Sequence, residues 1–253
     1  MSTERELHIL HLYPVEMSTY GDTGNILALV SRARAHGFVP RVDRLTADCT
    51  ELPEQVDVVV GGGGQDSGQL RIEAALGRLA DRFRALTEDG APMLLICGMY
   101  QLFGNSYVTG EGTTMRGIGV LDVDTKAGVG RRSDDICVDS PEFGRLLGYE
   151  NHSGITVLGE GTPALGTVVY GSGNGSEDGT EGARFHNLIG TYIHGPILPK
   201  NPAVTDWLIR TAAQRRYGVL PDPVPVPEYT EGARAQAWEQ LVRAHPEFRM
   251  NRH

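Results

Sequence analysis

The chain has 253 residues, a formal net charge of −9 and a sequence pI of about 5.4. This length suits one large α/β domain with a substantial buried core. The acidic surplus argues against nucleic acid as a main partner, because phosphate contacts need clustered Lys and Arg side chains. Solubility is the simplest interpretation of that surplus.

The cysteine content indicates a reducing compartment. Cys49, Cys97 and Cys137 are widely spaced, and none forms a CxxC pair. Such a sparse, odd count argues against a disulfide framework and against a structural zinc site. We expect no metal and no cofactor. The first residues lack the pattern of a signal peptide, and no window has the roughly 18 apolar residues of a membrane helix. We therefore expect a cytoplasmic protein.

Strands and helices are predicted to alternate through the first hundred residues. Continuous apolar runs indicate buried strands at Leu7–Tyr13, Asp57–Val60 and Pro92–Cys97. Helical spacing of apolar residues indicates amphipathic helices over Asn25–His36 and Gln69–Glu88. This order predicts an α/β fold with a mostly parallel sheet flanked by helices.

The segment from about residue 117 to residue 192 has a different pattern. It contains short apolar segments separated by glycines and charges: Gly117–Val123, Ile136–Val138, Ile155–Leu158 and Thr167–Tyr170. This pattern predicts a small β-rich insertion, with antiparallel pairing as one option. A last strand is expected over Gly190–His194, ending in a histidine.

The C-terminal part divides the chain into two expected regions. A helix is predicted over Val204–Tyr217, and a Pro-rich segment, Pro221–Pro227, follows as an extended linker. A terminal helix is expected over about Glu231–His245. We therefore expect a main domain over residues 1–220, with the linker and a C-terminal helix over residues 221–253 packed on or near it.

Cys97 is the leading candidate for a nucleophile. It ends an apolar strand and Gly98 follows, so a strand-to-helix turn here would raise the thiol above the carboxyl edge of the sheet. A helix that begins just after Cys97 would favour the thiolate. The alternative is a buried structural thiol, which is the commoner fate of a cysteine in an apolar run.

The neighbours of Cys97 favour the nucleophile. Cys97–Gln101 (CGMYQ) resembles the nucleophile elbow of the class I glutamine amidotransferases, and Asp57–Gly64 (DVVVGGGG) resembles their strand and glycine loop. The resemblance implies a flavodoxin-like fold and a substrate-holding role for Gln101. It also implies that backbone N–H groups of the loop and of the residue after the Cys stabilise the oxyanion: Gly63, Gly64 and Gly98.

The glycine loop Gly61–Gly64 also permits a phosphate-binding interpretation. A P-loop needs the pattern GxxxxGK[ST], and no Lys-Ser or Lys-Thr pair follows this loop. Nucleotide binding is therefore the weaker hypothesis for these glycines.

His194 is the candidate general base. The chain has 8 histidines, so the residue type alone says little. The resemblance extends to the flanking string Tyr192–Asn201 (YIHGPILPKN), which carries the family's histidine at this position. The implied role of His194 is to hold the thiolate and then to protonate the departing ammonia.

The resemblance covers residues 12 to 201 and points to one branch, the cobyric-acid-synthase-like glutaminases. Further matching stretches lie outside the elbow: Leu12-Tyr13, Tyr20–Ala28, Gly117–Asp122, Gly148–His152, Gly171–Asn174 and Leu188–Asn201. Within the branch, it implies a glutaminase subunit that pairs as a heterodimer with a MurT-like, Mur-ligase-family subunit. Such a pair amidates the D-glutamate of lipid II to D-isoglutamine, with L-glutamine as the nitrogen donor.

The resemblance also implies that Arg131 binds the carboxylate of glutamine, which a guanidinium fork suits. Arg132 is adjacent, so the role falls to one of the two, and an exposed loop arginine is the alternative. In the family's usual triad a Glu lies two residues after the His, and here Pro196 stands there. Met99 stands where the family usually has Gly.

The sequence is compatible with two roles for Asp22. It could orient His194 in place of the missing Glu, or it could cap the helix that begins near Asn25.

The sequence is also compatible with three other functions. The ammonia could serve another acceptor, as in a cobyrinate-type amidotransferase. The chain could be a non-catalytic, glutamine-binding regulatory subunit. It could also be an unrelated cysteine hydrolase on a similar sheet.

Overall fold

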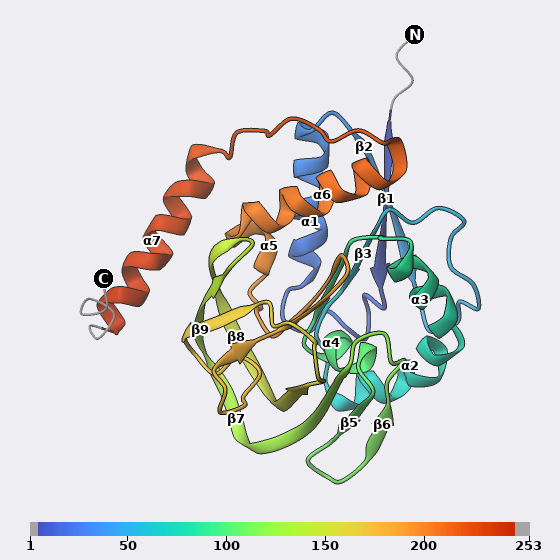
Figure 1. The fold of residues 1–253 in the computed structure, drawn as a ribbon, viewed down its shortest axis with the longest axis vertical. Helices are drawn as coiled ribbons and strands as arrows, with labels where there is room; N and C mark the ends of the chain where they lie inside the picture. Colours follow the sequence, from blue (N-terminus) through green and yellow to red (C-terminus); the bar gives the residue numbers. More distant parts are fainter. Residues whose placement is uncertain (1–4, 246–253) are drawn as a thin grey trace.

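The computed structural model describes residues 5–245, which form two six-stranded β-sheets packed beside each other. Figure 1 shows helices around the first sheet and a second, strongly curved sheet on one side of it. Within the described residues, no helix combines the length and the apolar content that a membrane crossing requires.

The first sheet confirms the predicted α/β fold class. Its strand order is β11-β12-β4-β3-β1-β2, and all neighbouring pairs are parallel except β11 with β12. Its strands are β1 Glu6–Leu12, β2 Val39–Leu45, β3 Val58–Gly61, β4 Met93–Ile96, β11 Ala183–Phe185 and β12 Leu188–Thr191.

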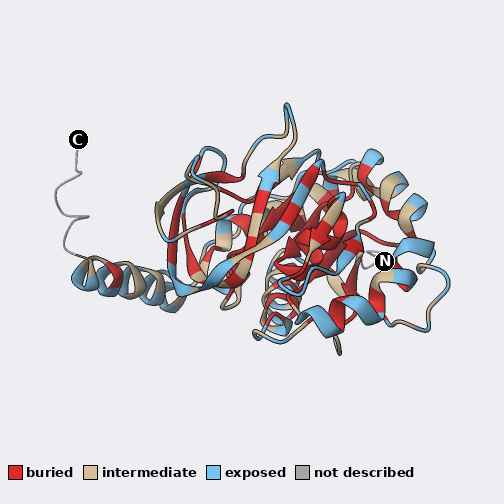
Figure 2. Ribbon diagram, turned by 90° about the horizontal axis from the view of Figure 1, so that it is seen from below, coloured by how far each residue is buried: buried red, intermediate tan, exposed pale blue. Residues whose placement is uncertain are grey.

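Burial explains why β3 and β4 lie at the centre of this sheet. Every residue of both strands is buried, as parallel strands covered on two faces require. Figure 2 shows the buried residues concentrated here. Because the strands are parallel, the loops after β1, β3 and β4 all emerge at the same carboxyl edge, the usual ligand crevice of an open α/β sheet.

Helices cover both faces of the first sheet. β1 leads to β2 in one direction and β3 leads to β4 in the other, so right-handed crossovers place α1 and α2 on opposite faces. The helices of this part of the chain are α1 Thr23–Ala35, α2 Asp66–Arg78, α3 Ala80–Glu88, α4 Gly98–Phe103, α5 Ile197–Lys200 and α6 Pro202–Tyr217.

The prediction of a single helix over Gln69–Glu88 was wrong. The chain forms α2 and α3, which meet at Leu79, and α2 begins at Asp66. At the break, the Leu79 N–H donates to the carbonyl of Leu76, three residues back, which tightens the turn. The apolar spacing continues through the break, so the sequence pattern could not reveal it.

The second sheet confirms the predicted β-rich insertion. Its order is β10-β9-β7-β5-β6 with β8 also paired to β7, and β7 and β8 form a long antiparallel hairpin. Its strands are β5 Ser106–Val108, β6 Thr114–Arg116, β7 Val123–Ser140, β8 Gly144–Leu158, β9 Gly166–Tyr170 and β10 Thr180–Glu181.

The apolar segment Gly117–Val123, one of those that suggested β-rich structure, is not a strand before its last residue, where β7 begins. The backbone N–H groups of Gly117 and Ile118 donate to the carbonyls of Asn105 and Leu102 instead of to a neighbouring strand. The chain therefore runs as a loop across the end of α4, which local apolar content does not distinguish from a strand.

The C-terminal helix is confirmed as α7, Glu228–Ala244. Arg32 of α1 ties the preceding linker to the body of the protein by donating to the carbonyls of Val224 and Pro225. Leu241 is the one residue of α7 that is fully buried. Figure 2 shows α7 leaving the body with most of its surface exposed.

The domain division at residue 220 stays a prediction, and residues 246–253 lie outside the described part.

Candidate active site

Cys97 occupies the predicted strand-to-helix turn between β4 and α4. Its backbone has φ 51° and ψ −106°, a region that L-residues other than glycine rarely adopt. The Cys97 N–H still donates to the carbonyl of Thr191 at 2.8 Å, which extends the pairing of β4 with β12 to this residue. The turn therefore holds the thiol at the carboxyl edge of the sheet.

The glycine loop after β3 lies directly against Cys97. A Cβ on Gly62 would lie 2.4 Å from the Met17 carbonyl, and a Cβ on Gly63 would lie 2.7 Å from Cε1 of His194. Only glycine allows this approach. The Gly63 N–H donates to Oδ2 of Asp22 at 2.7 Å.

The three predicted oxyanion donors therefore differ. The N–H of Gly63 is already bonded to Asp22. Within residues 5–245, the N–H groups of Gly64 and Gly98 have no hydrogen-bond acceptor. These two groups are the ones available to an incoming oxygen.

His194 lies three residues beyond β12 and is fully buried. Its backbone bridges to Tyr149 of β8, with the His194 N–H donating to the Tyr149 carbonyl at 2.7 Å and the return bond at 3.1 Å. Its Nδ1 lies 3.5 Å from Oδ1 of Asp22. The second sheet thus fixes the backbone of His194, while the side chain of His194 faces Asp22.

The charges around His194 favour its protonated form. Burial lowers the pKa of His194, but the Asp22 carboxylate and the Cys97 sulfur raise it more, to about 10. An imidazolium beside a cysteine favours the thiolate. Asp22 is at the N-cap position of α1 yet makes no side-chain capping bond, so its carboxylate serves His194 and Gly63.

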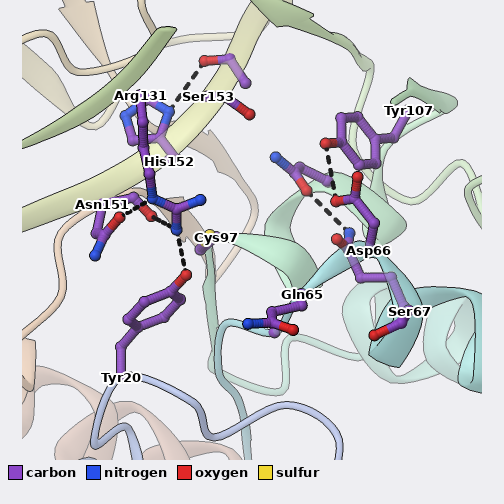
Figure 3. Close-up of a pocket in the computed structure, with 14 residues that line it drawn as sticks. Tyr20, Gln65, Asp66, Ser67, Cys97, Tyr107, Arg131, Asn151, His152 and Ser153 are labelled. Carbon is purple, nitrogen blue, oxygen red and sulfur yellow. Dashed lines mark hydrogen bonds between the residues drawn. The ribbon is translucent and has the colours of Figure 1, made fainter. Parts of the chain in front are cut away.

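Cys97 opens into a cleft of about 340 Å³ between the two sheets (Figure 3). The lining residues are mostly polar and come from the loop after β1, the glycine loop with the start of α2, α4, and strands of the second sheet: Tyr20, Gly64, Gln65, Asp66, Ser67, Gln69, Cys97, Gln101, Tyr107, Arg131, Asn151, His152, Ser153 and Gly154. Within residues 5–245, no group of three or more His, Cys, Asp or Glu side chains is arranged to hold a metal ion.

A family model described as the CobB/CobQ-like glutamine amidotransferase domain matches residues 8–202. The chain belongs to this family. It is 38% identical to the lipid II isoglutaminyl synthase subunit GatD of Staphylococcus aureus strain N315, over 94% of this chain and 95% of the relative.

A second relative agrees with this assignment, and a solved structure agrees with the fold. The GatD subunit of Streptococcus pneumoniae strain ATCC BAA-255 / R6 is 35% identical, over 89% of this chain and 86% of the relative. A solved structure described as a glutamine amidotransferase matches with a TM-score of 0.59 and 17% identity, over 81% of this chain and 98% of that one. The last match supports the fold alone.

In this family member, Arg131 points into the cleft. Its guanidinium donates to the side-chain and backbone oxygens of Asn151 and to the hydroxyl of Tyr20 (Figure 3). Arg132 does not line the cleft, and its guanidinium packs against Gly175, where a Cβ would lie 3.1 Å from Cζ. Of the two adjacent arginines, only Arg131 is therefore placed to meet a ligand in the cleft.

Gln101 forms part of the cleft wall. Its Oε1 accepts from Gln69 Nε2 at 2.9 Å, and its Nε2 donates to the hydroxyl of Tyr192 at 3.1 Å. Its amide orientation is therefore fixed by protein partners, and its contact with substrate stays a prediction.

The two departures from the family pattern have clear places in the structure. Pro196 packs on Gly24, and a Cβ added to Gly24 would lie 2.5 Å from Cγ of Pro196. Asp22 supplies the carboxylate beside His194. Met99 is fully buried against Gly61 and does not line the cleft. Met99 therefore does not narrow the cleft.

The predicted start of the first helix at Asn25 was wrong by two residues. The helix begins at Thr23, and Oδ1 of Asn25 instead accepts from the backbone N–H of Leu198. This bond ties α1 to the segment that follows His194.

Several cleft residues were not singled out from the sequence: Tyr20, Asp66, Gln69, Tyr107 and Asn151. Tyr20 and Asn151 lie in stretches that match the family, so a signal was present. Asp66 and Gln69 lie two and five residues after the glycine loop, in a segment that the sheet topology brings to the carboxyl edge. Tyr107 lies on a three-residue strand of the second sheet, and no local pattern indicates its place.

Proposed function

We propose that this chain is the glutamine-hydrolysing subunit of a lipid II isoglutaminyl synthase. In this proposal it releases ammonia from L-glutamine and passes it to a MurT-like, Mur-ligase-family subunit, which amidates the D-glutamate of lipid II to D-isoglutamine. The observation that carries the chemistry is the positive-φ Cys97 in the lining of a polar cleft, next to the buried His194–Asp22 pair. The near full-length similarity to two GatD subunits supports the acceptor.

The first half-reaction uses the thiolate of Cys97 and the imidazolium of His194. The Cys97 thiolate attacks the side-chain carbonyl carbon of glutamine, and the new C–S bond pushes an electron pair onto oxygen. The N–H groups of Gly64 and Gly98 stabilise that oxyanion, and one such donor is typically worth about 10²–10³ in rate. The His194 imidazolium protonates the nitrogen, the C–N bond breaks and ammonia leaves.

The second half-reaction frees the enzyme. His194, now neutral, takes a proton from water, which attacks the γ-glutamyl thioester. The C–S bond breaks, glutamate is released, and Cys97 returns as a thiolate beside the reprotonated imidazole. Asp22 keeps the ring oriented and stabilises its charge in both steps.

Direct delivery to a partner follows from the chemistry of ammonia. Free ammonia is protonated at neutral pH and loses its nucleophilicity, so a protected path to the ligase is expected. A cytoplasmic location is part of the proposal, and it agrees with the free thiols of all three cysteines.

Ammonia release from L-glutamine tests the proposal, measured with and without a MurT-like protein. The wild-type chain is expected to be active in the complex, and Cys97→Ser is expected to lower the rate to background. Cys49→Ser is the matched control, because Cys49 lies outside the cleft. Wild-type ammonia release by Cys97→Ser would refute the assignment. Tight glutamine binding without turnover in the complex would instead indicate a regulatory subunit.

A further inference from the structure

The cleft carries one guanidinium and one carboxylate. Among its described lining residues, Arg131 is the only Lys or Arg, and Asp66 is the only Asp or Glu. Figure 3 shows these two side chains on opposite sides of the cleft, with Cys97 between them. His152, the histidine in the lining, adds no positive charge at neutral pH because burial lowers its pKa. The cleft therefore carries a positive charge on one side and a negative charge on the other.

Asp66 is held in place from the second sheet. It is the first residue of α2, and its Oδ1 accepts from the hydroxyl of Tyr107 on β5 at 3.1 Å. Within residues 5–245, its other oxygen, Oδ2, has no hydrogen-bond partner. Asp66 is exposed at the cleft, so this oxygen is accessible to a ligand.

This charge pattern matches a free amino acid. L-Glutamine presents a neutral carboxamide at one end and a carboxylate and an ammonium group at the other. With the carboxamide at Cys97 and the carboxylate at Arg131, the ammonium group needs an acceptor on the remaining side of the cleft. A carboxylate forms charge-assisted bonds with an ammonium group that are stronger than neutral ones.

We propose that Asp66 determines specificity by binding the α-ammonium group of L-glutamine, with Tyr107 orienting its carboxylate. This inference rests on the proposed glutaminase function. It excludes glutamine whose α-nitrogen is acylated, as in a peptide or an N-acetylated amino acid, because that nitrogen is neutral. The enzyme would thus draw nitrogen from the free amino acid and spare glutamine within peptides.

A purely structural role for Asp66 predicts something different. An acidic residue in the first turn of α2 stabilises the helix through its dipole. Losing that effect would alter thermal stability and would affect all substrates alike. Discrimination between substrates with and without an α-amino group therefore separates the two roles.

The test pairs an enzyme change with a substrate change. The probes are L-glutamine and glutaramate, which is glutamine without its α-amino group. In the complex with its ligase, Asp66→Asn is expected to lower kcat/KM for L-glutamine by about 10- to 100-fold, mostly through KM, and to leave glutaramate unchanged. Glu111→Gln, which removes a charge on the exposed β5–β6 turn, is the control and should change neither value. Equal losses on both substrates, or no loss on L-glutamine, would overturn the proposal.

Binding provides a second measurement that does not depend on turnover. Calorimetry with the full chain carrying Cys97→Ala should show L-glutamine binding more tightly than glutaramate, and adding Asp66→Asn should remove that difference. A retained difference, or no glutamine binding, would overturn the role of Asp66. If the wild-type complex releases no ammonia while this binding pattern holds, the proposed hydrolysis fails and the recognition by Asp66 stands.

Discussion

At the residue scale, the site depends on side chains that are far apart in the sequence. Asp22 and His194 are separated by most of the chain, and Nδ1 of His194 lies 3.5 Å from the Asp22 carboxylate. Cys97 and His194 could be singled out from motif and resemblance. The choice between capping and orientation for Asp22 could not be made from sequence, because it depends on which way the carboxylate points.

The pH dependence of activity tests this role of Asp22. His194 must be protonated to release ammonia, so activity is present below its pKa and is lost as pH rises through about 10. Asp22 raises that pKa, so Asp22→Asn should move the alkaline limb of kcat/KM to lower pH and reduce kcat by about 10- to 100-fold. Measured pH profiles of the two proteins check this. An alkaline limb at the same pH in both would contradict it.

At the element scale, the segment from β12 to His194 is anchored by a buried carboxylate. Oε1 of Glu181 accepts from the hydroxyl of Thr191 and from the backbone N–H of Tyr192. These bonds fix the chain just where it leaves the sheet. The sequence predicted the strand through its apolar residues but placed its end at His194 rather than at Thr191, because the turn depends on Glu181 and on the bridge to Tyr149.

Glu181 also predicts how stability varies with pH. Burial raises its pKa to about 7, against the opposing effect of its hydrogen bonds with Thr191 and Tyr192. The folded state therefore favours the protonated acid, and this stabilisation is present below its ordinary pKa and is lost as pH rises through about 7. In the wild-type protein, this loss lowers the free energy of unfolding between pH 5 and pH 8. In Glu181→Gln, the decrease over the same pH range should be smaller by a few kcal/mol. Denaturant unfolding at both pH values checks this, with the exposed Glu111→Gln as control. An unchanged pH slope in Glu181→Gln would contradict it.

At the scale of the whole molecule, the active site is a product of two sheets. The parallel sheet supplies Cys97, the glycine loop and Asp66, and the second sheet supplies Arg131 and Tyr107. Apolar runs and helical spacing predicted the first sheet well, since each strand there is a continuous buried segment. They predicted the second only as a β-rich region. The position of Tyr107 opposite Arg131 follows from tertiary packing, which no local pattern encodes.

The proposed function depends above all on attack by Cys97 on the carboxamide of glutamine in the cleft between the sheets. Peptide mass spectrometry after treatment with a glutamine-mimicking diazo ketone tests this attack. We expect one adduct per chain, on Cys97, that excess L-glutamine suppresses and that Arg131→Gln forms more slowly. An adduct on Cys49 or Cys137, or an unmodified Cys97 in a complex that turns glutamine over, would contradict it.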